Sequence, residues 1–327
     1  ATPIARSLEA AAEDFPTKEG RNFIILITDG LESCDNDPCV IAQKLKEKEL
    51  LRFTKDIPIK QCTFEHLSLA HKPDYLRKIK REIESGLSSL STGDTAICDQ
   101  SWNVASAVTG GILNAVEQVV TGSLKNAFCI TRPPGHHANA DKGMGFCLFN
   151  HVAVAARYAQ QKLGVQKILI VDWDVHHGNG TQDIFYEDDS IFFFSTHQSP
   201  WYPGTGRTEE KGTGKGVGYN LNYPFPAGSG KKEILDYAFG CELPKHMAKF
   251  KPELILISAG FDSRINDPLG QFQLEDEDFF ELTKIILNLG DEYANSNVVS
   301  VLEGGYNLNG LASSSIAHLQ ALLNRTF

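Results

Sequence analysis

The sequence lacks several features that would place it in particular protein classes. It contains no apolar run long enough to span a membrane, and no basic segment followed by an apolar one near its start. We therefore expect no membrane association and a cytoplasmic location. Basic residues are outnumbered, with 31 lysines and arginines against 41 acidic residues and a formal charge of −10. Because nucleic-acid binding needs a basic surface, we expect no nucleic-acid partner.

Cysteine is also scarce, with seven residues scattered over 327 positions. An odd and scattered set does not predict a disulfide framework. The rest of the composition, 42% hydrophobic and 22% charged, is that of an ordinary globular protein. The length allows one large α/β domain or two smaller ones.

Four short apolar runs each lead into a polar segment with chemically reactive side chains. These runs cover residues 126–130, 168–171, 254–258 and 298–302. Runs that are apolar on both faces, with helical stretches between them, predict a parallel sheet covered on both sides. Such sheets bind ligands beyond the carboxyl ends of their strands, which is where all four polar segments fall.

The second run leads into Asp172, Asp174 and His176, which occupy alternate positions. Side chains alternate between the two faces of a strand, so these three should point the same way. Buried charges are costly unless they are paired or bound to a metal, and two carboxylates with an imidazole are typical of a metal site. A surface turn could also collect Asp and His residues, although the preceding apolar run favours the metal site.

Two further motifs carry candidate catalytic groups. His136 and His137 follow a Pro-Pro-Gly turn after the first run. A single histidine is more often structural, but an adjacent pair beside a metal site favours a catalytic role. Tyr306 follows Gly304 and Gly305, which allow the backbone to turn close to the site. The alternative for Tyr306 is an ordinary loop residue.

Hydrophobic periodicity predicts helices over 102–120, 150–163 and 275–293, and the last has an acidic first turn that suits the helix dipole. The glycine-rich segment 211–218 superficially resembles a dinucleotide-binding loop. That motif must follow a strand and open a helix, whereas the residues after 218 are typical of a strand. We therefore predict a flexible loop there.

Residues 1–45 differ in character from the rest of the chain. A strand and turn at 22–30, followed by the acidic segment 32–39, resemble the C-terminal half of a von Willebrand factor A domain. The Asp-x-Ser-x-Ser motif of that family is not found, and Thr2 with Asp29 cannot complete its metal site. We expect a short fragment whose strand at 23–27 could fill an edge position of the sheet.

From about residue 44 onward the chain resembles the histone deacetylase family, closest to its class II and bacterial lysine-deacetylase branch. The motifs are RPPGHHA (132–138), GFCLFN (145–150), DWDVHHGNGTQ (172–182), STHQ followed by YPGTG, AGFD with DPLG, and LEGGYNL. The resemblance implies one three-layer α/β/α domain of the arginase/deacetylase fold, with a mainly parallel sheet of about eight strands. It divides the chain into a fragment, 1–45, and a catalytic domain, 46–327, that we expect to lack the family's usual N-terminal opening.

The resemblance implies a zinc-dependent hydrolase that removes the acetyl group of acetyl-lysine. The implied site comprises Asp174, His176 and Asp262 as Zn²⁺ ligands, His137 as general base, His136 as its electrostatic partner held by Asp172, and Tyr306 as donor to the oxyanion. Three protein ligands leave a coordination position for water and substrate. Oxygen-rich ligation also suits Fe²⁺ or Co²⁺.

The resemblance also implies a substrate channel and a structural K⁺ site. The channel residues are Gly145, Phe146, Tyr202, Leu269 and Gly304, and the K⁺ site uses Asp172 and Ser195. Asp94 could accept a hydrogen bond from the substrate backbone or could be a solvated turn residue. Relatives specific for polyamines carry Glu in place of Leu269, so this chain favours acetylated lysine peptides or proteins.

The alternative substrate is an acetylpolyamine or another small acetylated amine. A non-catalytic binding or adhesion module, suggested by residues 1–45, is a third and less favoured interpretation. The sequence leaves a homo-oligomer open.

Overall fold

The computed structural model describes residues 25–27, 50, 54–55 and 57–324. Thr2, Asp29 and the acidic segment 32–39 lie outside these residues. None of the described helices is both long and apolar enough to cross a membrane.

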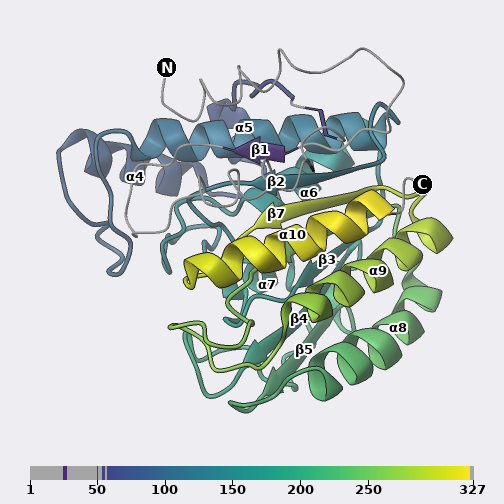
Figure 1. Ribbon diagram of the computed structural model, residues 1–327. Helices are drawn as coiled ribbons and strands as arrows, with labels where there is room; N and C mark the ends of the chain where they lie inside the picture. Colours follow the sequence, from purple (N-terminus) through teal and green to yellow (C-terminus); the bar gives the residue numbers. More distant parts are fainter. Residues whose placement is uncertain (1–24, 28–49, 51–53, 56, 325–327) are drawn as a thin grey trace.

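Seven parallel strands form one sheet in the described part of the chain (Figure 1). The strands are β1 (Ile25–Ile27), β2 (Asn126–Ile130), β3 (Ile168–Asp172), β4 (Ile191–Gln198), β5 (Asn220–Phe225), β6 (Leu254–Ala259) and β7 (Val298–Leu302). Their order across the sheet is β1-β2-β7-β6-β3-β4-β5, and every neighbouring pair is parallel. The predicted parallel sheet is confirmed, whereas the expected count of about eight strands is not.

Strand β1 lies within the segment that resembles a von Willebrand factor A domain. It pairs with β2 at the edge of the sheet, with Ile25 opposite Phe128. The predicted edge position is therefore correct. β1 thus belongs to the same sheet as the other described strands.

Alternation along the strands divides the core between two faces of the sheet. Ile168, Ile170, Leu254 and Leu256 belong to a cluster with α5 (Ser101–Val120) and α6 (His151–Leu163). Leu169, Val171, Ile255 and Ile257 belong to a cluster with α8 (Leu243–Phe250), α9 (Asp276–Tyr293) and α10 (Leu308–Asn324). Figure 1 shows α5 on one side of the sheet and α8, α9 and α10 on the other. Burial of both faces explains why the strands are apolar throughout.

The predicted helices 102–120, 150–163 and 275–293 agree with α5, α6 and α9 to within one residue. Asn150 caps α6, because its side chain accepts a hydrogen bond from the backbone N–H of Ala153 at 3.0 Å. Glu275 and Asp278 form a capping box at the start of α9. The glycine-rich segment 211–218 contains only the short turn η2 (Gly214–Gly216) before β5, so the prediction of a loop is confirmed.

The remaining helices complete the described fold. Helices α3 (Phe64–Leu67) and α4 (Pro73–Glu84) form a third apolar cluster with the loop that contains Leu90 and Ile97. Helix α7 (Asn179–Phe185) follows the Asp-x-Asp-x-His motif directly, and the π-helix η3 (Lys232–Glu242) continues into α8.

The strand order creates a switch point beside β3. From β2 the chain passes over β7 and β6 to reach β3, continues outward through β4 and β5, and then returns through β6 and β7. In such sheets the crevice at the carboxyl ends of the strands is the usual ligand site. At this end Asp172 lies opposite Ser195 of β4 and Ser258 of β6.

Candidate active site

The structure brings the three predicted metal ligands together. His176 Nδ1 lies 3.0 Å from Asp174 Oδ1 and 3.2 Å from Asp262 Oδ2. All three residues are buried, and one ligand atom from each lies within 4.8 Å of the others. Asp174 and His176 follow β3, whereas Asp262 follows β6, the neighbouring strand of the sheet.

Backbone N–H groups orient the two carboxylates. Asp174 Oδ2 accepts from Gly304 N at 2.8 Å, and Asp262 Oδ1 accepts from Val175 N at 2.9 Å. Asp262 Oδ2 is fully buried and has no hydrogen-bond partner among the described residues. Asp262 Oδ2 thus makes no well-aligned hydrogen bond, although His176 Nδ1 lies 3.2 Å away. A buried carboxylate oxygen of this kind, close to another carboxylate and an imidazole, fits a divalent cation, and these ligand types suit Zn²⁺.

Glycines make room for these carboxylates. A Cβ atom on Gly304 would lie 2.0 Å from Asp262 Oδ2 and 2.5 Å from Asp174 Oδ2. A Cβ atom on Gly260 would lie 2.2 Å from Asp174 Oδ2. Gly304, predicted as a channel residue, therefore lies directly against the metal cluster.

The charges of the cluster are strongly coupled. Burial alone would lower the pKa of His176, but the carboxylates of Asp174 and Asp262 close to its Nδ1 raise it to about 10. Burial and the charge of Asp174 raise the pKa of Asp262 to about 7. Burial opposes ionisation of Asp174, yet the charges of His136 and His176 lower its pKa. A cation bound between these groups would displace the proton of His176.

His136 is surrounded by negative charge. Its Nδ1 lies 2.9 Å from Asp172 Oδ2, and its Nε2 lies 3.9 Å from Asp174 Oδ1. Burial favours the neutral imidazole, but the charges of Asp172, Asp174 and Glu303 raise the pKa of His136 well above its ordinary value. The predicted pairing of His136 with Asp172 is present in the structure.

His137 has a neutral partner. Its Nδ1 lies 2.8 Å from Asn179 Oδ1. Burial, together with repulsion from His136 and His176, lowers the pKa of His137 well below its ordinary value. The surroundings therefore shift the pKa values of the two adjacent histidines in opposite directions.

Glu303 is a buried residue of the site that the sequence reasoning did not identify. It is fully buried, and its Oε2 accepts from Gly135 N at 2.6 Å and His136 N at 3.2 Å. Its Oε1 accepts from Ser258 Oγ at 3.0 Å. Glu303 thus supports the turn that carries both histidines, and its place beside the two glycines of LEGGYNL was the only available signal.

Tyr306 lies close to the metal cluster, with its ring centroid 6.5 Å from that of His176. The sequence reasoning also did not identify Asp267. Its carboxylate holds the backbone of Tyr306 by accepting a hydrogen bond from Tyr306 N at 2.8 Å. Arg132 donates to Gly305 O at 3.1 Å and lies over the Tyr306 ring. Burial and the charges of Asp262 and Asp174 raise the pKa of the Tyr306 hydroxyl well above its ordinary value.

Phe146 and Tyr202, which the sequence predicts as channel residues, lie beside these groups. Phe146 is 6.4 Å from Tyr306, and Tyr202 is 5.1 Å from His137, measured between ring centroids. Gly145 has a φ of 57°, and a Cβ atom there would lie 2.3 Å from His137 Cδ2. Phe146 also has a positive φ, 67°, which is uncommon for a residue with a side chain.

Asp94 connects two of the predicted channel residues. Its carboxylate accepts from Tyr202 Oη at 2.6 Å and from Gly145 N at 2.9 Å. Asp94 is exposed, so a role toward the substrate backbone stays a prediction beside this bridging role.

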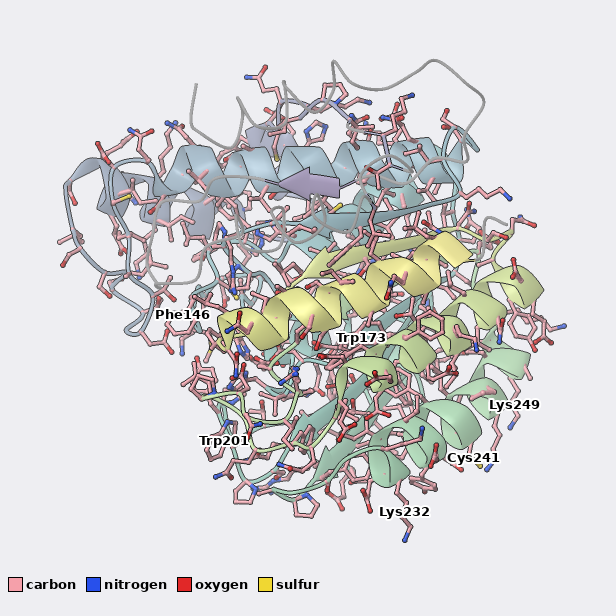
Figure 2. All side chains as sticks on the ribbon, in the orientation of Figure 1. Phe146, Trp173, Trp201, Lys232, Cys241 and Lys249 are labelled. Carbon is pink, nitrogen blue, oxygen red and sulfur yellow. The ribbon has the colours of Figure 1, made fainter. Side chains whose placement is uncertain are left out.

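Leu269 lies in a loop that reaches the same region. Its backbone N–H donates to Asp267 Oδ1 at 2.9 Å, and its carbonyl accepts from Trp201 Nε1 at 2.8 Å. Leu269 is 39% exposed and Trp201 36%. Figure 2 shows Phe146 and Trp201 on the side of the molecule away from Cys241 and Lys249.

Asp172 and Ser195, the predicted K⁺ ligands, are register partners on adjacent strands. Asp172 Oδ1 accepts from Asp174 N at 3.1 Å, and Ser195 Oγ lies 3.0 Å from His197 Nδ1. The K⁺ assignment stays a prediction.

The chain resembles known proteins over most of its length. The sequence profile described as "Histone deacetylase domain" matches residues 36–322, so the match begins within the predicted fragment 1–45. The division of the chain at residue 45 stays a prediction. The crystal structure of an HDA15 HD domain superposes with a TM-score of 0.83 at 32% identity, covering 93% of this chain and 88% of that one.

Curated relatives agree with this match. "Histone deacetylase 10, chloroplastic" of Oryza sativa subsp. japonica is 40% identical over 80% of this chain, which spans 61% of that protein's length. A "Probable deacetylase" of Archaeoglobus fulgidus is 38% identical over 76% of this chain and 68% of its own length. "Polyamine deacetylase HDAC10" of Homo sapiens is 37% identical over 86% of this chain and 43% of its own length. The chain therefore belongs to the histone deacetylase family, whose domain is that of a hydrolase acting on amide bonds.

Proposed function

We propose that this chain is a zinc-dependent deacetylase that hydrolyses the acetyl amide of acetyl-lysine in peptides or proteins to lysine and acetate. The buried cluster of Asp174, His176 and Asp262 carries the proposal, because it stands beside a neutral histidine and a protonated tyrosine. This arrangement combines a cation site, a base and a hydrogen-bond donor, which amide hydrolysis requires. A non-catalytic module would have no use for it.

Zinc bound at the cluster would supply a Lewis acid for the substrate carbonyl and the attacking water. The same donor set accepts Fe²⁺ or Co²⁺, so the ion carried in the cell is part of the proposal. We also assign a structural K⁺ to Asp172 and Ser195.

His137 serves as the general base. Its pKa is low, so the imidazole is neutral near pH 7 and can accept the proton of the attacking water. With Nδ1 occupied by Asn179, Nε2 is the atom that receives this proton and returns it to the leaving amine. His136 stays charged beside Asp172 and stabilises negative charge as it develops.

Tyr306 serves as the donor to the developing oxyanion. Its raised pKa keeps the hydroxyl protonated, and hydrogen bonds from two backbone N–H groups to Asp267 hold its loop in place. A preorganised donor of this kind stabilises the transition state more than the ground state.

Leu269 favours acetyl-lysine over the alternative substrate, an acetylpolyamine. The human relative is named a polyamine deacetylase, which keeps that alternative open. A carboxylate at position 269 would pair with the internal ammonium of a polyamine, whereas Leu269 supplies only apolar surface there. The methylene stem of lysine is uncharged and suits Phe146 and Tyr202.

The first prediction concerns the metal site. Gly304→Ala should raise the Kd for Zn²⁺ by roughly 10- to 100-fold, as substitutions next to metal ligands commonly do. The new Cβ atom would lie 2.0 Å from Asp262 Oδ2 and would displace it. Calorimetric titration with Zn²⁺ measures the effect. Gly230→Ala is the control, since its nearest contact is 3.3 Å. Unchanged affinity in folded Gly304→Ala would contradict the ligand assignment.

The second prediction concerns Tyr306. Tyr306→Phe should keep its zinc and lose about 10²–10³ in kcat on an acetyl-lysine peptide, the usual cost of removing one preorganised donor. Steady-state kinetics with metal analysis provides the test. A higher KM with unchanged kcat would make Tyr306 a binding residue instead.

The third prediction concerns pH. The base must be neutral to act, and the pKa of His137 is lowered from 6.5, so kcat should rise through a limb that lies below pH 6.5. Asn179→Asp places a carboxylate beside Nδ1, which favours the charged imidazole and should move this limb to higher pH. Profiles of kcat against pH for both proteins decide the matter. A wild-type limb above pH 7 is inconsistent with His137 as the base.

The fourth prediction concerns substrate choice. Acetyl-lysine peptides should be hydrolysed with a higher kcat/KM than N-acetylspermidine, and Leu269→Glu should narrow or reverse this preference. The physical reason is that the new carboxylate would pair with the internal ammonium of the polyamine. Leu269→Gln, which is similar in size and uncharged, is the control. Equal or better turnover of the polyamine by the native protein would favour the alternative substrate.

A further inference from the structure

A chain of side-chain hydrogen bonds runs from His137 to the surface of α7. His137 Nδ1 meets Asn179 Oδ1 at 2.8 Å, and Asn179 Nδ2 donates to Asn139 Oδ1 at 3.1 Å. Asn139 Nδ2 then donates to the carboxylate of Asp183, which lies on the exposed side of the helix. Neither Asn139 nor Asp183 has a role in the proposed mechanism.

The carboxylate at the end determines the direction of every hydrogen bond in this chain. An ionised carboxylate only accepts, so Asn139 must present its NH₂ group to Asp183 and its carbonyl oxygen to Asn179. That oxygen in turn requires the NH₂ group of Asn179, which leaves the Asn179 carbonyl oxygen facing His137. An acceptor at this position requires a proton on His137 Nδ1.

The neutral imidazole has two tautomers, and only one suits a base acting through Nε2. With the proton on Nδ1, Nε2 carries a lone pair, whereas with the proton on Nε2 that atom cannot accept another. We propose that Asp183 is a positioning residue that, through Asn139 and Asn179, holds His137 in the Nδ1–H tautomer. This proposal rests on the proposed function, in which His137 is the base.

The backbone positions of Asn139, Asn179 and Asp183 are fixed by the fold. Only the orientation of the two side-chain amides remains to be determined. Asn139 N donates to Lys142 O at 2.8 Å, and its carbonyl lies 3.0 Å from His71 Nδ1. Asn179 and Asp183 stand four residues apart on α7, so they share one face of the helix. The three side chains therefore meet through the fold, and the carboxylate decides which way the amides point.

A second contact limits the size of the effect. Asn179 Nδ2 also lies 3.3 Å from His137 O, and this contact favours the same amide orientation. Loss of Asp183 should therefore weaken the preference for one tautomer without reversing it. We expect kcat to fall roughly threefold to tenfold, in line with the modest net contribution of one hydrogen bond.

The kinetic test begins with Asp183→Asn, which keeps the size of the side chain and can both donate and accept. Its kcat on an acetyl-lysine peptide should fall by the stated factor, while KM and zinc content remain those of the wild type. Asp141→Asn is the matched control, because it also removes a negative surface charge near Asp183. Asp141 pairs with Lys72 and makes no hydrogen bond to Asn139, Asn179 or His137. Burial raises the pKa of Asp183, so the assays are run at about pH 8 to keep its carboxylate ionised.

A double variant separates this role from a purely structural one. In Asn139→Asp with Asp183→Asn, the acceptor-only group moves one position closer to Asn179 and the total charge stays the same. This variant should recover most of the lost kcat. Wild-type kcat in Asp183→Asn, or a double variant no better than the single one, would overturn the proposal.

The tautomer can also be observed without turnover. The ¹⁵N shifts of labelled histidine distinguish a protonated ring nitrogen from one with a lone pair. His137 should show protonated Nδ1 in the wild type and a mixture in Asp183→Asn, with the wild-type pattern restored in the double variant. An unchanged pattern overturns the proposal. A protein that lacks deacetylase activity but shows these shifts would refute the proposed function and leave the hydrogen-bond chain intact.

Discussion

The burial of four carboxyl groups in one place is the constraint on which the rest of the site depends. Asp172, Asp174, Asp262 and Glu303 are all completely buried, and they follow or end three strands of the same sheet. A low-dielectric interior does not tolerate such charge without compensation. The sheet brings these groups together, so backbone N–H groups and imidazoles stabilise them, and the proposed cation would add to this stabilisation.

The negative charge is distributed unequally around the two adjacent histidines, and as a result their pKa values differ. His136 receives the charges of Asp172 and Glu303, whereas His137 faces the uncharged amide of Asn179. Glu303 is itself affected, because burial raises its pKa to about 7. The pKa of the His136 imidazole is thereby raised and that of the His137 imidazole lowered. The difference between the two pKa values follows from the positions of the carboxylates around the turn that carries His136 and His137.

Much of this could be predicted from local sequence patterns. The strand ends, the alternate spacing from Asp172 onward and the positions of three helices depend on residues close in the sequence, and they were correct. Glu303, Asp267 and the Asn139–Asp183 pair could not be found in this way. Their roles depend on hydrogen bonds between segments far apart in the chain, and no periodicity distinguishes them from other polar loop residues. The strand β1 lies between these cases, because its existence was predictable but its pairing with β2 required the whole sheet.

Asp267 links its own loop, which carries Leu269, to the loop that carries Tyr306. One of its oxygens accepts from the backbone of Tyr306 and Asn307, and the other accepts from the backbone of Leu269. A change in the backbone near Leu269 would therefore also move Tyr306. An insertion in this loop would be pleiotropic, because it would alter substrate selectivity and turnover rate together. Exchange of the exposed side chain at position 269 leaves these backbone bonds in place. Diversification of substrate range in proteins built this way should proceed by point substitution at the rim before it proceeds by remodelling of the loop.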